Sequence, residues 1–237
     1  MEFKIQEPPI NIGADISVKS FEIIEKELQN YPKAKEFDSD ELAVISRLIH
    51  TTSCFEQVLE HIHFSPNGLH KIKELLSQKA KIIVDVNMIK VGLSQFYLDK
   101  YQNEVICYIN EPFTYEYAKA NQTTRSYAAV IKAIEMHKDS PMILACGNAP
   151  TFIYAAINTL LKHNVDLSKV ALLLFPVGFV NVTESKEYGK KFSQAFDVPS
   201  VIMQGRFGSS TMTVATLHAI YKLIKDYDGT TKYNGKE

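Results

Sequence analysis

His50 is the side chain whose type and sequence setting most favour acid–base chemistry. It lies at the end of a predicted helix, three residues after Arg47, and Thr51 and Thr52 follow it. The partial negative charge at a helix C-terminus favours an imidazolium ion, the form that donates a proton. Either threonine hydroxyl is near enough in sequence to bond a ring nitrogen. The same spacing also fits a histidine that only caps a helix at the surface, so a catalytic acid and a capping residue are equally compatible with it.

Arginines mark candidate anion sites. Only three of the 26 basic residues are arginines, and Arg47, Arg125 and Arg206 all lie in or beside predicted loops. The planar guanidinium group suits carboxylate or phosphate recognition better than an ammonium group does. The formal net charge is -1, which argues against bulk capture of nucleic acid or of an anionic membrane. Any anion site must therefore be local.

Two glycine-containing loops follow predicted strands. In CGNAPT (146–151), Gly147 and Asn148 precede Pro150 at a first helical position, which points backbone N–H groups outward as an anion site. GRFGSST (205–211) has the same arrangement with Arg206 added. Taken alone, such turns reflect chain topology more often than chemistry. Neither loop matches the dinucleotide or P-loop pattern, so a nicotinamide or P-loop nucleotide enzyme is disfavoured.

We expect no metal site and a cytoplasmic location. His61 and His63 have the spacing of a metal pair on a strand, but no third ligand accompanies them, and ordinary loop residues are favoured. Three cysteines without a CxxC pair are typical of reduced thiols in a cytosol. No signal-peptide pattern opens the chain, and no apolar run approaches the ~20 residues of a membrane span.

The elements that must position these residues form an α/β pattern. Five apolar segments alternate with helical patterns, which predicts an open, mainly parallel five-stranded sheet with helices on both faces. The expected strands are 81–86, 105–109, 141–146, 170–175 and 200–205. Because the carboxyl ends of parallel strands share one edge, the loops that follow them, including CGNAPT and GRFGSST, should form one rim.

The N-terminal part is predicted to be helical and to pack alongside this sheet. Asp15 or Ser17 is expected to cap a first helix, and Asp38 or Ser39 a second helix that carries Arg47 and His50 near its end. A short helix at 55–62 and another after Ser65 should precede the sheet. We expect one domain over 1–237, with a surface arm at 1–14 and a frayed tail at 226–237.

Seven ordered motifs resemble one known family. They are SFEII at 20–24, RLIHTTS at 47–53, DVNM with VGL at 85–93, TTRSYAA at 123–129, GNAPT at 147–151, PVGFVNVTESK at 176–186 and GRFGSSTMT at 205–213. Together they resemble precorrin-8X methylmutase, also called precorrin isomerase or cobalt-precorrin-8 methylmutase. The resemblance covers nearly the whole chain, from about 15 to about 224.

The resemblance implies a step of cobalamin biosynthesis. A methyl group of the corrin ring migrates from carbon 11 to carbon 12, which converts precorrin-8X to hydrogenobyrinate, or cobalt-precorrin-8 to cobyrinate. It further implies a flavodoxin-like fold, a homodimer with its site near the subunit interface, a tetrapyrrole (corrinoid) substrate and product, and no external cofactor.

The resemblance also implies roles for particular residues. His50 would be the catalytic acid, which protonates or hydrogen-bonds a ring nitrogen while the π-electron system shifts. Arginines, hydroxyls and backbone N–H groups would bind the carboxylates around the macrocycle. The implied substrate-binding residues are Ser20, Arg47, Thr51, Asn87, Met88, Arg125, Gly147, Asn148, Gly178 and Arg206.

Departures from the family's usual pattern leave two other hypotheses open. The departures that bear on pocket shape are at Ser53, Cys54, Tyr127, Phe207 and Ser209. One alternative is a non-catalytic paralogue that binds or carries a corrinoid. The other, independent of these departures, is an unrelated flavodoxin-like enzyme or response module that acts on a phosphorylated ligand, with phosphate bound at Gly147, Gly178 and Gly205.

Overall fold

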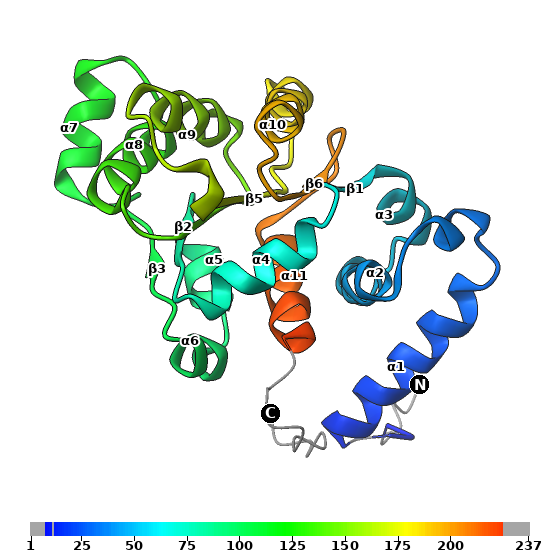
Figure 1. The fold of residues 1–237 in the computed structure, drawn as a ribbon. Helices are drawn as coiled ribbons and strands as arrows, with labels where there is room; N and C mark the ends of the chain where they lie inside the picture. Colours follow the sequence, from blue (N-terminus) through cyan, green and yellow to red (C-terminus); the bar gives the residue numbers. More distant parts are fainter. Residues whose placement is uncertain (1–7, 11, 225–237) are drawn as a thin grey trace, which may run out of the picture.

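The computed structural model describes residues 8–10 and 12–224 and shows a six-stranded sheet between two groups of helices (Figure 1). The strands are β1 (Ile62–Phe64), β2 (Lys81–Val84), β3 (Val105–Ile106), β4 (Met142–Cys146), β5 (Val170–Leu174) and β6 (Ser200–Met203). Their order across the sheet is β1-β6-β5-β4-β2-β3.

Eleven α-helices and two 3-10 helices connect the strands within the described residues. They are α1 (Gly13–Leu28), η1 (Pro32–Glu36), α2 (Ser39–Thr52), α3 (Phe55–His61), α4 (Gly68–Ser77), α5 (Asn87–Gly92), α6 (Gln95–Tyr101), α7 (Pro112–Ala120), α8 (Arg125–His137), α9 (Pro150–Lys162), η2 (Leu167–Lys169), α10 (Val182–Phe196) and α11 (Ser210–Leu223). None of these helices combines the length and apolar character needed to cross a membrane.

The parallel part of the sheet confirms the predicted α/β class. Strands β2 to β6 pair in parallel, and they follow the spatial order second, first, third, fourth, fifth, which is the flavodoxin-like order. The chain reverses its direction of travel across the sheet between β2 and β4. In folds of this kind, ligands bind at the carboxyl ends of the strands on either side of that switch point.

The prediction of five strands was wrong by one. Strand β1 pairs antiparallel with β6, with Ile62 opposite Met203 and Phe64 opposite Val201. The sequence 55–62 was read as helix, and His63 was expected in a loop. A strand of three residues is too short to show an alternating pattern, and this one is formed by its pairing with β6.

The sheet separates two apolar cores. Successive residues of β4 point to opposite faces, so that Ile143 and Ala145 join one core while Leu144 and Cys146 join the other. Helices α8, α9 and α10 cover one face, and α4, α5 and α11 cover the other (Figure 1). The first three helices pack alongside the sheet at its β1 end, as predicted, and α2 lies against α11 there.

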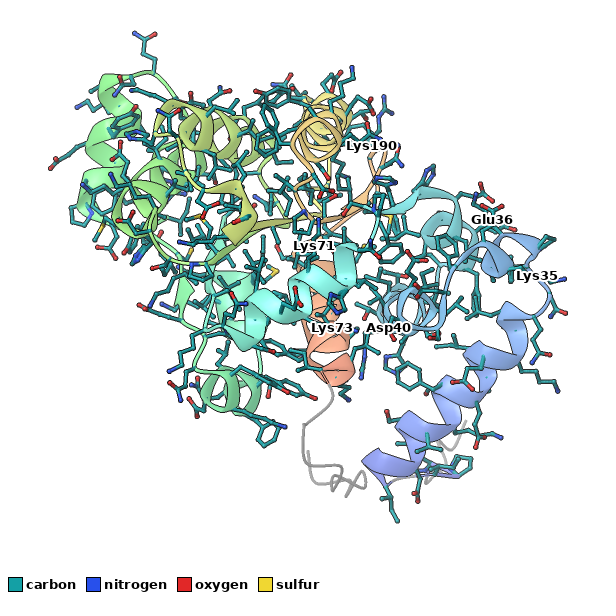
Figure 2. The ribbon with its side chains drawn as sticks, viewed as in Figure 1. Lys35, Glu36, Asp40, Lys71, Lys73 and Lys190 are labelled. Carbon is teal, nitrogen blue, oxygen red and sulfur yellow. The ribbon has the colours of Figure 1, made fainter. Side chains whose placement is uncertain are left out.

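Helix α2 is fixed at its start by local and long-range contacts. Asp38 and Glu41 form a capping box: the Asp38 side chain accepts from Glu41 N at 2.9 Å, and Glu41 Oε2 accepts from Asp38 N at 3.1 Å. An ion pair of 2.5 Å between Asp40 and Lys73 joins the first turn of α2 to α4 (Figure 2). Asp38 or Ser39 was expected to cap this helix, and Asp38 is the residue that does so.

The start of α1 was predicted less accurately than that of α2. Helix α1 begins at Gly13, after Ile12 and without a side-chain cap, whereas Asp15 or Ser17 was expected to cap it. Asp15 lies in the first turn instead, where a carboxylate interacts favourably with the helix dipole. Of the expected arm, residues 1–7 and 11 lie outside the described residues, as does the whole of the expected tail at 226–237.

Candidate active site

His50 and Arg47 meet on one aromatic ring. The buried stripe of α2, which includes Ile45 and Ile49, turns Arg47 and His50 toward α1. The imidazole of His50 stacks on the ring of Phe21, with centroids 5.0 Å apart and an interplanar angle of 9°. The Cζ atom of Arg47 lies 4.9 Å from the centroid of the same ring. Phe21 and Arg47 line a groove of ≈ 940 Å³ between α1, α2 and α11, within the size range of small-molecule sites.

The electrostatic setting of His50 corrects the expectation of a favoured imidazolium. Burial, followed by the positive charge of Arg47, lowers the pKa of His50 below its ordinary value. The imidazole is exposed on one side, so water and ligands can reach it. A lowered pKa makes the imidazolium ion a stronger acid.

The nearby hydroxyl groups make other bonds than those predicted. Thr51 Oγ1 donates to the Arg47 carbonyl at 2.9 Å, and Thr52 Oγ1 donates to the Leu48 carbonyl at 2.8 Å. Ser20 Oγ likewise donates to the Ile16 carbonyl at 2.8 Å. Neither threonine bonds a ring nitrogen of His50, because each hydroxyl is satisfied by the carbonyl one turn earlier in its own helix. The oxygens of Ser20 and Thr51 keep lone pairs that can accept from a ligand, whereas Thr52 Oγ1 already accepts from Cys54 N at 3.3 Å.

The switch point between β2 and β4 contains a residue that the sequence argument overlooked. Asp85 directly follows β2, and its carboxylate accepts from the N–H groups of Gly147 at 3.0 Å, Asn148 at 2.8 Å and Ala149 at 2.6 Å. The side chain is 1% exposed. Burial raises the pKa of Asp85, and the three backbone donors, together with the Cys146 thiol, act in the opposite direction.

Asp85 therefore occupies the anion cradle that was predicted for an external ligand. The N–H groups of Gly147 and Asn148 do not point outward as a free anion site, because an internal carboxylate already accepts from them. Gly147 has a packing role as well: a Cβ atom there would lie 2.6 Å from Ser210 Cα, so α11 approaches too closely for any side chain. The exposed part of this loop is the side chain of Asn148.

Arg206 lies in the loop between β6 and α11, beside the loop between β5 and α10 that carries Gly178 and Phe179. Its Cζ atom lies 5.1 Å from the centroid of Phe179, a side chain that is 81% exposed. Gly178 donates its N–H to the Arg206 carbonyl at 3.4 Å. Gly178 and Gly205 both have positive φ angles, 137° and 69°, which a residue with a side chain adopts only with strain. The Gly178 N–H was predicted to take a substrate carboxylate, but it takes a backbone carbonyl here.

Arg125 is the first residue of α8, which covers the opposite face of the sheet from α11. Its Nη1 atom donates to Tyr115 Oη at 2.8 Å and to Asn110 Oδ1 at 3.5 Å, and its Cζ atom lies 5.0 Å from the Tyr115 ring centroid. The guanidinium group is exposed and keeps donors free for a carboxylate. Asn87 and Met88 begin α5 directly after β2, with Met88 62% exposed.

The predicted residues thus form separate groups within one chain. The His50 group lies between α1 and α2, whereas Arg125, Arg206 and Met88 lie around the rim of the sheet. Among the described residues, no hydrogen bond or ion pair joins His50 to Arg125 or Arg206. Among them there is likewise no group of three His, Cys, Asp or Glu side chains that could hold a metal ion.

The comparison with protein families identifies the family. The model of the precorrin-8X methylmutase family matches residues 15–223. The chain belongs to the precorrin-8X methylmutase family. It is 34% identical to a cobalt-precorrin-8 methylmutase of Priestia megaterium, over 98% of this chain and 99% of the relative. It is 31% identical to a precorrin-8X methylmutase of Sinorhizobium sp, over 89% and 95% of the two chains.

A solved structure of the family has the same fold. The precorrin-8X methylmutase of Thermus thermophilus superposes with a TM-score of 0.73 and 32% identity, over 88% of this chain and 96% of the other. The methylmutase family and the filled cradle at Asp85 together leave no support for a phosphate-binding module. The prediction of the family from the seven motifs is confirmed.

The departures from the usual methylmutase pattern have local structural roles. Ser53 has a φ of 57° at the C-cap of α2, a conformation that favours glycine. Ser209 caps α11 by accepting from Met212 N at 3.1 Å. Tyr127 and Phe207 are partly buried against the two cores. Cys54 Sγ lies 3.1 Å from the Thr52 carbonyl.

Proposed function

We propose that the protein is a methylmutase of cobalamin biosynthesis that moves a corrin-ring methyl group from carbon 11 to carbon 12. The observation that carries the proposal is the stacked, partly exposed His50 with its lowered pKa, in a chain that belongs to this family. Donation of a proton or a hydrogen bond from His50 to a ring nitrogen would withdraw electron density from the π-system and stabilise the transition state of the shift.

The substrate is a large flat macrocycle that carries several carboxylates, and the chain presents matching groups. Arg47, Arg125 and Arg206 each keep guanidinium donors for a carboxylate. Phe179 and Met88 offer exposed apolar surface beside the rim, against which the ring can pack. The reaction is an isomerisation that neither gains nor loses electrons, so the proposal requires no external redox cofactor.

We further propose a homodimer whose interface completes the site. Helix α1 buries Ile24 and Leu28 on one side, yet Ile16 and Ile23 on another side are 45% and 53% exposed, and Ile12, directly before the helix, is 61% exposed. An exposed apolar surface of this kind is typical of a subunit interface. A second copy would also bring its own rim arginines toward His50, which lies apart from them within one chain.

We place the enzyme in the cytoplasm. Cys54, Cys107 and Cys146 are all free thiols in the structure, and unpaired cysteines are typical of a reducing compartment.

An absorbance assay tests the proposed activity. Purified protein is mixed in catalytic amount with precorrin-8X and, separately, with cobalt-precorrin-8, because methyl migration changes the conjugated chromophore. We expect a time-dependent conversion of many equivalents of one or both compounds. An immediate shift limited to one equivalent would instead support a corrinoid carrier, and no change with either compound would contradict both functions.

A further inference from the structure

Lys186 of α10 is a buried ammonium group with a specific pair of acceptors. Its residue is 1% exposed, and Nζ donates to the Gly205 carbonyl at 2.9 Å and to the Phe207 carbonyl at 2.8 Å. Burial lowers the pKa of Lys186 to about 8. Burying an ammonium group is unfavourable, and an apolar side chain would fill the space without that cost. The bonds that Lys186 makes therefore need an explanation beyond packing.

Those bonds fix the backbone on both sides of Arg206. Three consecutive carbonyl groups are held: Lys186 binds those of Gly205 and Phe207, and the N–H of Gly178 binds that of Arg206. The next residue, Gly208, packs so closely that a Cβ atom there would overlap the carbonyl oxygens of Phe175 and Pro176. The backbone of the loop is thus held by Lys186, by Gly178 and by the close packing of Gly208. The Arg206 side chain stays exposed and lies over the ring of Phe179.

We propose that Lys186 is a positioning residue for substrate recognition, which orients Arg206 toward a carboxylate of the macrocycle by binding the carbonyl groups on either side of it. The inference rests on the proposed role of Arg206 as a carboxylate ligand. Lys186 does not touch the substrate; it lowers the cost of ordering the loop when the substrate binds, because the loop is already held in the binding conformation.

The test compares Lys186→Met, Arg206→Ala and the double variant with the wild type. Lys190→Met is the matched control, since Lys190 lies one turn later on α10 (Figure 2) and contacts the Gln204 side chain at 3.4 Å instead of the carbonyls beside Arg206. For each protein we would measure kcat and KM for the substrate that is turned over, and Kd for precorrin-8X by absorbance titration. Lys186→Gln, which keeps an amide donor, serves as the conservative variant.

We expect Lys186→Met to raise KM and Kd about tenfold, with a smaller change in kcat. Arg206→Ala should raise them by at least as much, and the double variant should be no worse than Arg206→Ala, because Lys186 acts through that side chain. Lys186→Gln should be intermediate, and Lys190→Met should resemble the wild type.

Three results would overturn the inference. They are an unchanged KM and Kd in Lys186→Met, multiplied effects in the double variant, or failure of both Lys186 variants to fold, which would make the residue structural only. A wild type that binds precorrin-8X without turnover would instead refute the proposed activity, while the Kd values would still test the role of Lys186.

Discussion

At the scale of the residue, the protonation of His50 depends on competing influences. The helix C-terminus favours the charged ring, but at an exposed position this effect amounts to only about 0.3–1 kcal/mol. Stacking on Phe21 removes water from one face of the imidazole, and Arg47 brings a like charge close to it. Burial and Arg47 prevail, and the pKa of His50 is lowered.

The pH dependence of the reaction should reveal this coupling. A general acid must be protonated, so kcat/KM of the free enzyme should fall as pH rises through the His50 pKa, below the ordinary value of 6.5. Arg47→Met removes the neighbouring positive charge, which raises that pKa and moves the falling limb to higher pH. The measurement is kcat/KM between about pH 5 and 8.

Arg47→Lys provides the control for this prediction, since it keeps the charge and should leave the limb close to its wild-type position. Both variants lose the guanidinium group and with it any bidentate contact to a carboxylate, so lower activity alone would not separate them. If the fall of kcat/KM with pH occurs at the same pH in Arg47→Met as in the wild type, the coupling of Arg47 to His50 is contradicted.

At the scale of the element, α1 has an exposed apolar surface that nothing within the described part of the chain covers. It packs on α2 with one apolar side and exposes Ile16 and Ile23 on another. Ile16→Glu together with Ile23→Glu should convert the proposed dimer to monomer, because two carboxylates would have to be buried at the interface. We expect turnover to fall with the dimer fraction, as followed by sedimentation velocity at several concentrations.

Lys26→Gln is the matched control on the same helix, since Lys26 is exposed and polar; it should remain a dimer. A wild type that sediments as a monomer at all concentrations, or a double variant that stays dimeric and active, would contradict the proposed interface on α1.

The loop elements show why a local sequence pattern predicts a site only in part. The turn at Gly147 and Asn148 was correctly predicted to follow a strand and to gather N–H groups. The anion that they bind, however, is Asp85, 62 residues earlier than Gly147. That contact depends on β2 and β4 lying side by side, which no local spacing reveals. The DVNM motif that contains Asp85 was the available signal.

At the scale of the whole molecule, alternation of strands and helices was enough to predict the parallel sheet and its shared rim. The five predicted strands are present, each within a few residues of its expected bounds. What the sequence did not predict was β1, because an edge strand of three residues exists through its pairing with β6. Nor could it predict that His50 lies apart from Arg125 and Arg206, since α2 packs at the β1 end of the sheet, α8 covers the opposite face from α11, and Arg206 lies in the loop between β6 and α11.

The measurement that tests the central claim most directly is turnover by His50→Ala in the absorbance assay. His61→Ala is the control, since His61 is an exposed histidine at the end of α3. We predict that His50→Ala loses at least about a hundredfold in kcat while it binds precorrin-8X with little change in Kd, and that His61→Ala behaves as the wild type. Near-normal turnover by His50→Ala would contradict the assignment of His50 as the acid.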